Sequence, residues 1–517
     1  MSQDVGLAGL PRRIHEAFRP WAEQHPQRVA LADAQRSLRY GELGSTVDAV
    51  AERLRASGVR AGDRVLLVAE NSVALAVCIL AVSQLDAWSA TVNARLSSRE
   101  IDNFLSHSGA RRALYFGANS PQAKTHGEER GAEKVDWPGI GEVLLGPLNQ
   151  QAETEPVEED GAKQVAAMVY TSGTTGSPKA VMLTHANLLF VARNSMRMRR
   201  ITPEDVIYGV LPLSHVYGLS SLLGSALISG AALHLVPRFQ PDQLARALAE
   251  DGVTVLHGAP AMYAKLLEWA ESNRQPLRAP HLRVAQSGGA PLTMPLKQSF
   301  EKALGLTLHN GYGMTEASPS ICQTRMDAPR TDCSVGPAIP GIEVRLNGAE
   351  QDPEGVGELW VRGPNVMKGY YRAPELTAEA VTPDGWLRTG DLARREADGA
   401  LVIAGRSKEL IIRSGFNVYP VEVEQVLNAF PNVLQSAVVG RAVEGNEEVV
   451  AFIEPWPDAV IDLDALRAHL KNNLSPYKIP SEIVVLDRLP AAATGKVLKK
   501  ELQLRAARSA PANSLNS

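Results

Sequence analysis

The stretch MVYTSGTTGSPKAVMLTH, residues 168–185, sets small and hydroxyl-bearing residues between two apolar segments. A strand-like AAMVY (166–170) leads into it, and a helix-like LTHANLLFVARNSM (183–196) follows. A Gly, Ser and Thr loop in this position offers backbone N–H groups and hydroxyls to phosphate oxygens, and Lys179 adds a positive charge. The spacing departs from the GxxxxGK[ST] pattern of the P-loop. Taken alone, the stretch therefore indicates a phosphate site or a flexible linker with equal weight.

The bulk composition is that of an ordinary globular protein, with 517 residues, 44% hydrophobic and 21% charged. The net charge of −4 is spread along the chain and gives no reason to expect a nucleic-acid or anionic-lipid partner. Three widely spaced cysteines, Cys78, Cys322 and Cys333, indicate neither a disulfide framework nor a zinc site. The N-terminus lacks a secretory pattern, and the most apolar run (72–82) is too short for a membrane span. We expect a cytoplasmic protein without a transmembrane segment, and its oligomeric state is not indicated.

Alternation of strand-like and helix-like segments predicts α/β layering through most of the chain. Residues 121–164 are polar and acidic, which predicts a surface excursion. Residues 335–405 contain shorter strands separated by turns, and the last hundred residues predict a separate small α/β unit. The final segment from residue 506 is rich in small and polar residues, so we expect it to be disordered.

Four further motifs carry residues suited to a nucleotide. LHNGYGMTEAS (308–318) sets Tyr312 between two glycines, where the ring can lie flat on a base, and supplies Thr315 for a phosphate and Glu316 for Mg²⁺. DGWLRTGDLA (384–393) offers Asp391 to two ribose hydroxyls. The alternatives are a tight turn with a core tyrosine and a turn aspartate that caps its own backbone. AGRSKELIIRSGFNVYPVEVE (404–424) and LPAAATGKVLKKEL (489–502) add cations, for which a solvated linker and a surface lysine are the ordinary interpretations.

Together these motifs resemble those of the adenylate-forming superfamily of acyl-CoA synthetases, luciferases and nonribosomal-peptide adenylation domains. YTSGTTGSPK, GYGMTE, WLRTGD, GRSKELI and a C-terminal GK occur in the order typical of that superfamily, from about residue 10 to residue 502. The resemblance implies a mixed α/β fold with a large N-terminal domain of layered α/β subdomains and a β-rich subdomain. It places this domain at residues 1–407, a small mobile C-terminal α/β domain at 408–505, a tail at 506–517, and the hinge at Lys408.

The resemblance also implies a two-step reaction in which a carboxylate attacks the α-phosphate of ATP and a thiol then displaces AMP. Lys496, His215 and Lys179 are the implied catalytic residues, and Thr171 and Glu316 the implied Mg²⁺ residues. Gly415 and Phe416 would contact CoA. The implied ATP-binding residues are Thr171, Ser172, Gly173, Thr174, Thr175, Gly176, Lys179, Gly289, Ala290, Pro291, Asn310, Gly311, Tyr312, Gly313, Thr315, Asp391, Arg406 and Lys496.

The segment LPLSHVYGLSSLL (211–223) matches the part of the family that lines the acid site. It contains no Asp for a substrate ammonium group, and no Arg occurs between residues 211 and 230 for a second carboxylate. We therefore expect a neutral-tailed monocarboxylic acid, either a medium-chain fatty acid or an aromatic acid, as in coumarate-CoA ligases and medium-chain acyl-CoA synthetases. The expected acid-binding residues are His215, Tyr217, Gly218, Ser221, Gln286, Gly288 and Gly313.

The expected function is thus an ATP- and Mg²⁺-dependent acid–CoA ligase, with ATP and CoA as co-substrates. Two alternatives stay open: an acyl-AMP ligase that loads a carrier protein, and a binding protein on a non-catalytic synthetase fold. Two residues depart from the family pattern, Ala180 after Pro-Lys and Ala491 before the C-terminal GK.

Overall fold

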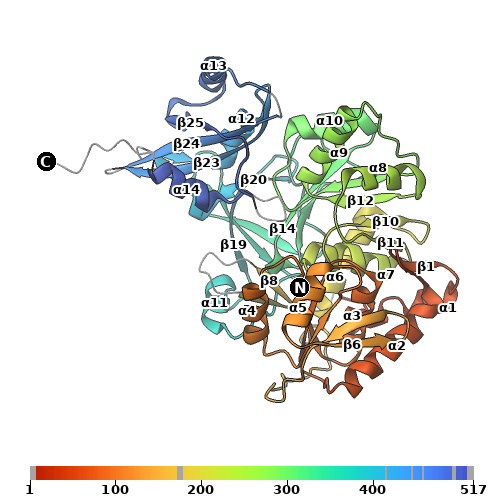
Figure 1. Cartoon of the computed structure of the whole chain (residues 1–517). Helices are drawn as coiled ribbons and strands as arrows, with labels where there is room; N and C mark the ends of the chain where they lie inside the picture. The colour runs from red at the N-terminus through yellow and green to blue at the C-terminus, as the bar shows by residue number, and fades with distance from the viewer. Residues whose placement is uncertain are drawn as a thin grey trace.

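The computed structural model describes residues 7–171, 179–413, 416–443, 446–456, 459–491 and 497–508. Two eight-stranded sheets form the larger part of the molecule, and three smaller sheets follow them along the chain. Figure 1 shows the C-terminal domain, in blue, beside the larger N-terminal part, in red to green. The predicted mixed α/β class, with a large N-terminal and a small C-terminal domain, is confirmed.

The first sheet has the order β15-β14-β13-β12-β10-β11-β1-β2. Neighbouring strands from β14 to β1 are parallel, and an antiparallel strand closes each edge. In a sheet of this kind, ligands bind outside the carboxyl ends of the strands. The strands are β1 (Val29–Ala32), β2 (Ser37–Arg39), β10 (Val206–Gly209), β11 (Ala232–Leu235), β12 (Val255–Gly258), β13 (Val284–Ser287), β14 (Leu308–Gly313) and β15 (Ser320–Gln323).

The second sheet has the order β18-β9-β8-β4-β3-β5-β7-β6, with a parallel centre of β8, β4, β3 and β5. Its strand β8 continues into the loop quoted above and returns as β9. The strands are β3 (Arg64–Ala69), β4 (Trp88–Asn93), β5 (Arg112–Tyr115), β6 (Glu133–Trp137), β7 (Gly141–Leu145), β8 (Val165–Thr171), β9 (Lys179–Thr184) and β18 (Gly369–Tyr370).

The main hydrophobic core includes residues of both large sheets and of the helices between them. Helix α3 (Val73–Gln84) is apolar on all sides and is buried along its length except at Gln84, as expected of a helix inside a large protein. Within the described residues, no helix is long and apolar enough to cross a membrane. The other helices of the N-terminal domain are α1 (Arg19–Gln24), α2 (Tyr40–Ala56), α4 (Ser98–Ser108), α5 (Pro121–Glu129), α6 (His185–Arg199), α7 (Ser225–Ser229), α8 (Pro241–Glu250), α9 (Pro260–Ser272), α10 (Met294–Leu304) and α11 (Pro374–Ala380).

A four-stranded antiparallel sheet leads from the large sheets to the C-terminal domain. Lys408 lies in the short helix η6 (Ser407–Glu409), between this sheet and the hairpin that opens the C-terminal domain. A hinge at Lys408 stays a prediction. The remaining elements are β16 (Glu343–Asn347), β17 (Gly357–Arg362), β19 (Leu387–Arg395), β20 (Leu401–Arg406), β21 (Ile411–Arg413), β22 (Phe416–Val418), α12 (Pro420–Asn428), β23 (Val433–Val443), β24 (Asn446–Pro455), α13 (Leu463–Asn473), β25 (Glu482–Val485) and α14 (Lys499–Arg508).

Polar contacts join the C-terminal domain to the four-stranded sheet. The buried Lys478 ammonium lies 2.9 Å from Glu354 of the N-terminal part and 2.8 Å from Glu422 of its own domain. Tyr419 donates a 2.9 Å hydrogen bond to Asp352. Lys478–Glu354 and Tyr419–Asp352 cross the boundary and each involves a charged group, so charge-assisted hydrogen bonds help to hold the two domains in this relative position.

The predicted surface excursion at 121–164 is mostly exposed, and its first part, residues 121–145, is ordered as α5 and the β6–β7 hairpin at the edge of the second sheet. One predicted boundary is wrong. The tail does not begin at residue 506, because α14 continues to Arg508 and buries Ala506 against the C-terminal sheet. Residues 509–517 lie outside the described part of the chain.

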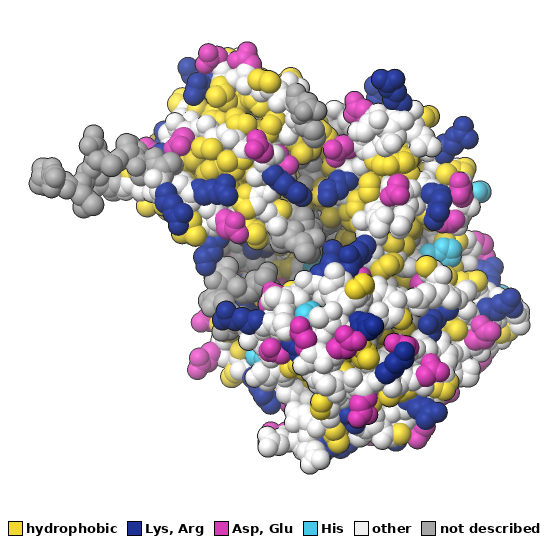
Figure 2. Space-filling model, in the orientation of Figure 1, with side chains coloured by type: hydrophobic (Ala, Val, Ile, Leu, Met, Phe, Trp, Pro, Cys, Tyr) yellow, Lys and Arg dark blue, Asp and Glu magenta, His cyan; other side chains and the backbone are white. Residues whose placement is uncertain are grey.

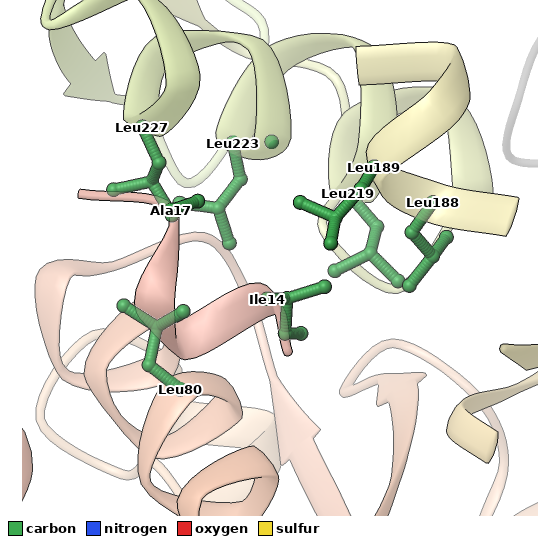
Figure 3. A pocket seen from close by; sticks show the side chains of 9 residues that line it. Ile14, Ala17, Leu80, Leu188, Leu189, Leu219, Leu223 and Leu227 are labelled. Atoms are coloured by element: carbon green, nitrogen blue, oxygen red, sulfur yellow. The ribbon is translucent and has the colours of Figure 1, made fainter. Parts of the chain in front are cut away.

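The π-helix η3 (Tyr217–Gly224) carries the expected acid-binding segment and runs directly into α7. A small apolar cavity of about 20 Å³ lies behind it, between η3, α6, α3 and the N-terminal segment (Figure 3). Only hydrocarbon and Gly224 line this cavity, so it offers no group to a carboxylate or a phosphate.

At the far end of α7, Gly230 has φ +76°, and the Trp21 indole donates a 2.9 Å hydrogen bond to the Ile228 carbonyl.

We expect Gly230→Ala to lower the free energy of unfolding by about 3 kcal/mol, measured by urea denaturation. A Cβ there would lie 2.5 Å from the Trp21 ring, on a backbone conformation that already disfavours alanine. The matched control is Gly252→Ala, which has φ +68° and nothing within 4 Å of the added Cβ. It should cost about 1 kcal/mol. Equal losses in the two variants would contradict the role of Trp21 in holding this end of α7.

Candidate functional site

The quoted loop joins two paired strands of the second sheet. Thr171 on β8 and Lys179 on β9 are register partners, so the loop begins and ends at one place. The Lys179 ammonium lies 5.7 Å from the centroid of the Tyr370 ring. Five of the predicted phosphate-binding residues lie outside the described part of the chain: Ser172, Gly173, Thr174, Thr175 and Gly176.

Tyr370 connects this end of the hairpin to Glu316. Its hydroxyl donates a 2.8 Å hydrogen bond to Glu316 Oε1, and β18 places it by pairing with β9. Burial, with a further effect of Glu316, raises the pKa of Tyr370, so the phenol stays a donor. Sequence reasoning missed Tyr370, although the GYY triplet at 369–371 was a visible aromatic signal. A single carboxylate beside the predicted phosphate-binding hairpin would suit Mg²⁺, which is usually held by one or two carboxylates together with nucleotide phosphates.

Tyr312, Asp391 and Arg406 are brought together from two different sheets. The Tyr312 hydroxyl donates to the Asp391 carboxylate, and Arg406 Nε lies 3.1 Å from Asp391 Oδ1. Asp391 and Arg406 are register partners on β19 and β20. Burial and the adjacent carboxylate raise the pKa of Tyr312, which keeps its proton available for this bond. Ribose hydroxyls would therefore meet a carboxylate that already has two partners.

The backbone around Tyr312 is shaped by close approaches. A Cβ on Gly313 would lie 2.1 Å from the Pro319 carbonyl oxygen, so only glycine fits there. Asn310 fixes the strand from the other side by donating to the Cys333 carbonyl at 2.9 Å. Beside β14, Gly289 has φ +83°, and it is exposed together with Pro291 just beyond the end of β13. Thr315 is buried and Ala290 is half-buried.

His215 stands at the turn before η3. Its Nδ1 accepts a 3.3 Å hydrogen bond from the Tyr217 backbone N–H, which leaves Nε2 to carry the proton of the neutral ring. The side chain is exposed, yet the protein around it lowers its pKa below the ordinary value. A Cβ on the neighbouring Gly218 would lie 2.2 Å from the Pro212 carbonyl oxygen, which requires glycine in this turn.

The predicted acid-binding segment on η3 adjoins a set of buried polar side chains, the Gln286 cluster: Arg199, Tyr217, His257, Gln286 and His309. His257, Gln286 and His309 are register partners across β12, β13 and β14, so they form one row on the sheet. Arg199, the last residue of α6, donates through Nε to Gln286. The Tyr217 and His257 rings are 5.8 Å apart. Sequence reasoning singled out Tyr217 and Gln286 but missed the other three.

Arg199 was missed because RMRR (197–200) has the composition of an exposed basic helix end. Its burial depends on Gln286 and the Thr324 carbonyl, 87 and 125 residues away in the sequence. The predicted neutral tail of the acid rested on the absence of arginine between 211 and 230. Arg199 lies outside that range but beside Tyr217, so the absence of arginine between 211 and 230 no longer supports a neutral tail.

The predicted CoA-side residues lie apart from these groups. Phe416 on β22 is exposed and stacks on Tyr477, with ring centroids 4.7 Å apart, inside the C-terminal domain. Phe416 and Lys408 thus lie in the C-terminal domain and in η6, while the expected acid-binding segment lies on η3. Gly415 and Lys496 lie outside the described residues.

Two family models match the sequence. The one described as "AMP-binding enzyme" covers residues 18–371, and the one described as "AMP-binding enzyme C-terminal domain" covers residues 422–496. The chain belongs to the AMP-binding enzyme family. The residues brought together above, from the β8–β9 hairpin to Tyr312 and Glu316, fall inside the first match.

Relatives of this AMP-binding enzyme extend over nearly its whole length. A feruloyl-CoA synthase from Amycolatopsis sp. is 34% identical over 94% of this chain and 97% of its own. The structure of ATP-bound MatB from Rhodopseudomonas palustris superposes with a TM-score of 0.83 at 30% identity, covering 96% of this chain and 99% of that one. The o-succinylbenzoate CoA synthetase of Bacillus subtilis, in complex with ATP and magnesium, gives a TM-score of 0.78 at 30% identity, covering 94% and 99%.

The enzyme is thus an adenylate-forming acid–CoA ligase, and the predicted superfamily is confirmed. Figure 2 shows that the surface of the enzyme is hollowed where the C-terminal domain meets the larger part. The Asp391–Arg406 pair belongs to the four-stranded sheet at this boundary, and Lys408, the predicted hinge residue, follows directly after the sheet in η6.

We expect His257 to make the enzyme sensitive to acid. Burial, with a further effect of Arg199, lowers the pKa of His257 to about 3, whereas in the unfolded chain it titrates near 6.5. Between these values only the unfolded chain binds the proton, so stability falls as the pH drops below about 6.5. This histidine alone accounts for about 2 kcal/mol of loss between pH 7 and pH 5.

The test compares urea denaturation of the wild type and His257→Gln at pH 7 and pH 5. The variant should lose about 2 kcal/mol less over that interval than the wild type. The exposed His281→Gln is the control and should keep the wild-type pH dependence. An unchanged pH dependence in His257→Gln would contradict a neutral buried His257.

Proposed function

We propose that this enzyme binds Mg·ATP along the end of β14, forms an acyl-adenylate from a carboxylic acid, and transfers the acyl group to CoA. One observation carries the proposal. Tyr312 connects to Asp391 and Arg406, while Glu316, four residues further, connects to Tyr370 and, through its ring, to Lys179. The contacts of Tyr312 would bind the base and ribose of one nucleotide, and the contacts of Glu316 would bind its phosphates. Both sets start from the end of β14.

The assigned roles follow the charge on each part of the nucleotide. Tyr312 and the Gly289–Pro291 turn would hold the base, and Asp391 and Arg406 the ribose. Thr315 would contact the α-phosphate, and Lys179 with the loop from Thr171 to Gly176 the outer phosphates. Glu316 would hold Mg²⁺, which neutralises phosphate charge when bound. The remaining residues of the ATP list, Asn310, Gly311 and Gly313, shape the strand.

In the first step a carboxylate oxygen of the acid attacks the α-phosphorus, and the bond from that phosphorus to the bridging oxygen breaks to release pyrophosphate. In the second step the CoA thiolate attacks the acyl carbon, and AMP leaves with the carboxylate oxygen. Negative charge gathers at the α-phosphate in the first step, so positioning and charge stabilisation are the main contributions of the protein. Lys496 would bridge the carboxylate and the α-phosphate, and neutral His215 would donate from Nε2 to the carboxylate.

The acid would lie between His215 and the Gln286 cluster. Tyr217 packs against Gly288, since a Cβ on Gly288 would lie 3.0 Å from its ring. An aromatic face beside a glycine suits a planar ring, and the feruloyl and o-succinylbenzoate relatives favour the aromatic class over the medium-chain fatty acid. Ser221 is buried on the same π-helix and would contact the acid from the side of η3.

For the acceptor we propose CoA rather than a carrier protein. The relatives named above as CoA synthases support this choice. Phe416 is exposed at the edge of the C-terminal domain, where a pantetheine chain could reach it. A non-catalytic binding protein is disfavoured because Lys179, Glu316, Asp391 and Lys496 are all present.

The test is AMP release by the purified full chain with Mg·ATP, with CoA or a carrier protein, across benzoates, cinnamates and straight-chain acids, each with and without a second acidic group. We expect CoA-dependent AMP release, with the best rates among aromatic acids. An optimum among aliphatic chains would overturn the aromatic assignment. Release only with a carrier protein would overturn the acceptor, and no release with any acid would favour the non-catalytic alternative.

Lys496→Ala should lower adenylate formation by roughly 100-fold or more, since it removes a cation from the α-phosphate. The same variant should convert supplied acyl-AMP and CoA into thioester at nearly the wild-type rate. Pyrophosphate–ATP exchange measures the first reaction, and thioester formation the second. Lys471→Ala, at an exposed lysine of the same domain, is the control and should affect neither. Equal losses in both half-reactions would contradict a role confined to the first step.

A further inference from the structure

The described residues contain six buried Arg and Lys side chains, and five of them have a carboxylate within 4 Å. The pairs are Arg13–Asp86, Arg64–Glu155, Lys297–Glu301, Arg441 with Glu448 and Glu482, and Lys478 with Glu354 and Glu422. Arg199 is the sixth, is fully buried, and has no such partner. A buried charge without a counterion is expensive, so an exception of this kind points to a partner that comes from outside.

Arg199 also has unused hydrogen-bonding capacity. Its Nε donates to Gln286 and its Nη1 to the Thr324 carbonyl at 2.7 Å, while Nη2 has no partner among the described residues. Arg64, the other fully buried arginine, shows the structural alternative. It donates to four backbone carbonyls besides facing Glu155. Unlike Arg64, Arg199 therefore has one N–H donor group, Nη2, without an acceptor and a positive charge without a carboxylate among the described residues.

Further buried groups without partners belong to the Gln286 cluster and to the π-helix η3. The Tyr217 hydroxyl, both ring nitrogens of His257 and the Ser221 hydroxyl are buried, and none has a hydrogen-bond partner in the described structure. Burial lowers the pKa of His257 and of His309 to about 3, so both are neutral near pH 7. Burial lowers the pKa of Arg199 only to about 10, so it keeps its charge. The cluster thus presents one positive charge and several neutral donors.

The Gln286 cluster borders the acid side of the site. A Cβ on Gly311 would lie 3.0 Å from Gln286 Nε2, and one on Gly288 would lie 3.0 Å from the Tyr217 ring. Gly311 is partly exposed, and His215 is exposed at the entrance to η3. A substrate held by its reacting carboxylate near His215 would therefore extend its far end toward Tyr217 and Arg199.

We propose that Arg199 receives a second anionic group, a carboxylate or a sulfonate, at the far end of the acid that this enzyme activates. The inference rests on the proposed function, since it assigns the other end of the same substrate. The anion would accept hydrogen bonds from Arg199 Nη2 and the Tyr217 hydroxyl. It would supply the one counterion that the Gln286 cluster lacks. The acid is then a ring or chain with an acidic group at each end, not a neutral-tailed monocarboxylic acid.

The test uses pairs of acids that differ only at the far end: terephthalate and 4-methylbenzoate, 4-carboxycinnamate and 4-methylcinnamate, adipate and hexanoate. A 4-sulfobenzoate arm separates sulfonate from carboxylate. We expect the doubly acidic member to have a kcat/KM at least tenfold higher in one pair or more. A wild-type enzyme that prefers the methyl-ended member in every pair, with no preference for the sulfonate, overturns the proposal.

Arg199→Met should lower kcat/KM for the preferred doubly acidic substrate by roughly 10- to 100-fold, the range of a charge-assisted hydrogen bond. The loss should be in KM rather than kcat, because the far end is bound equally before and during reaction. Arg199→Lys keeps the charge and should recover part of the preference. Arg197→Met, at an exposed arginine of the same helix, is the matched control and should leave the preference unchanged.

Calorimetric binding of the doubly acidic substrate, with a non-hydrolysable ATP analogue, separates this inference from the proposed function. Binding to the wild type that weakens in Arg199→Met supports the inference even if no AMP is released. Equal binding to wild type and Arg199→Met, with both proteins showing the same cooperative thermal unfolding, overturns it. If Arg199→Met fails to fold, the wild-type pair preference and Arg199→Lys decide. An Arg199→Lys variant that keeps the full wild-type preference would likewise overturn the proposal.

Discussion

The hydrogen bond from Tyr312 to Asp391 is the contact on which the arrangement of the site depends. It ties the end of β14, in the first large sheet, to β19, in the four-stranded sheet that leads to the C-terminal domain. Burial keeps the phenol protonated, so the bond is between a neutral donor and a carboxylate. The same strand end presents Glu316 to the β8–β9 hairpin through Tyr370. Three sheets are thereby held around one short segment.

The pairing of buried polar groups distinguishes those that stabilise the fold from those available to bind a substrate. Most buried charges of the described residues are paired, as stability requires. The groups around Gln286 are the exception, and they lie where the acid is expected. Unpaired buried donors destabilise the free protein, and a ligand that supplies acceptors removes this destabilisation on binding. In the proposed arrangement, the acid would meet the positively charged Gln286 cluster and the nucleotide ribose would meet the Asp391 carboxylate.

Much of this could be predicted from sequence where the signal was local or came from the family resemblance. The strand before the quoted loop and the apolar α3 lie where their patterns predicted, whereas Tyr312, for which a tight turn was one interpretation, lies on strand β14. Arg199 could not be predicted, because its neighbours Arg197 and Arg200 are exposed and its own burial depends on residues far along the chain. Helix α5 was missed since it buries only three residues, Ala123, His126 and Gly127. The end of α14 was missed because its burial of Ala506 depends on the C-terminal sheet.

The most direct measurement follows the oxygen that the proposed chemistry transfers. The acid is labelled with ¹⁸O in its carboxylate and incubated with the enzyme, Mg·ATP and CoA, and the nucleotide product is analysed by mass spectrometry. The account predicts AMP that carries one ¹⁸O atom, because the carboxylate oxygen that attacks the α-phosphorus leaves with AMP. Unlabelled AMP, or ADP with the label in inorganic phosphate, would contradict an acyl-adenylate intermediate at this site.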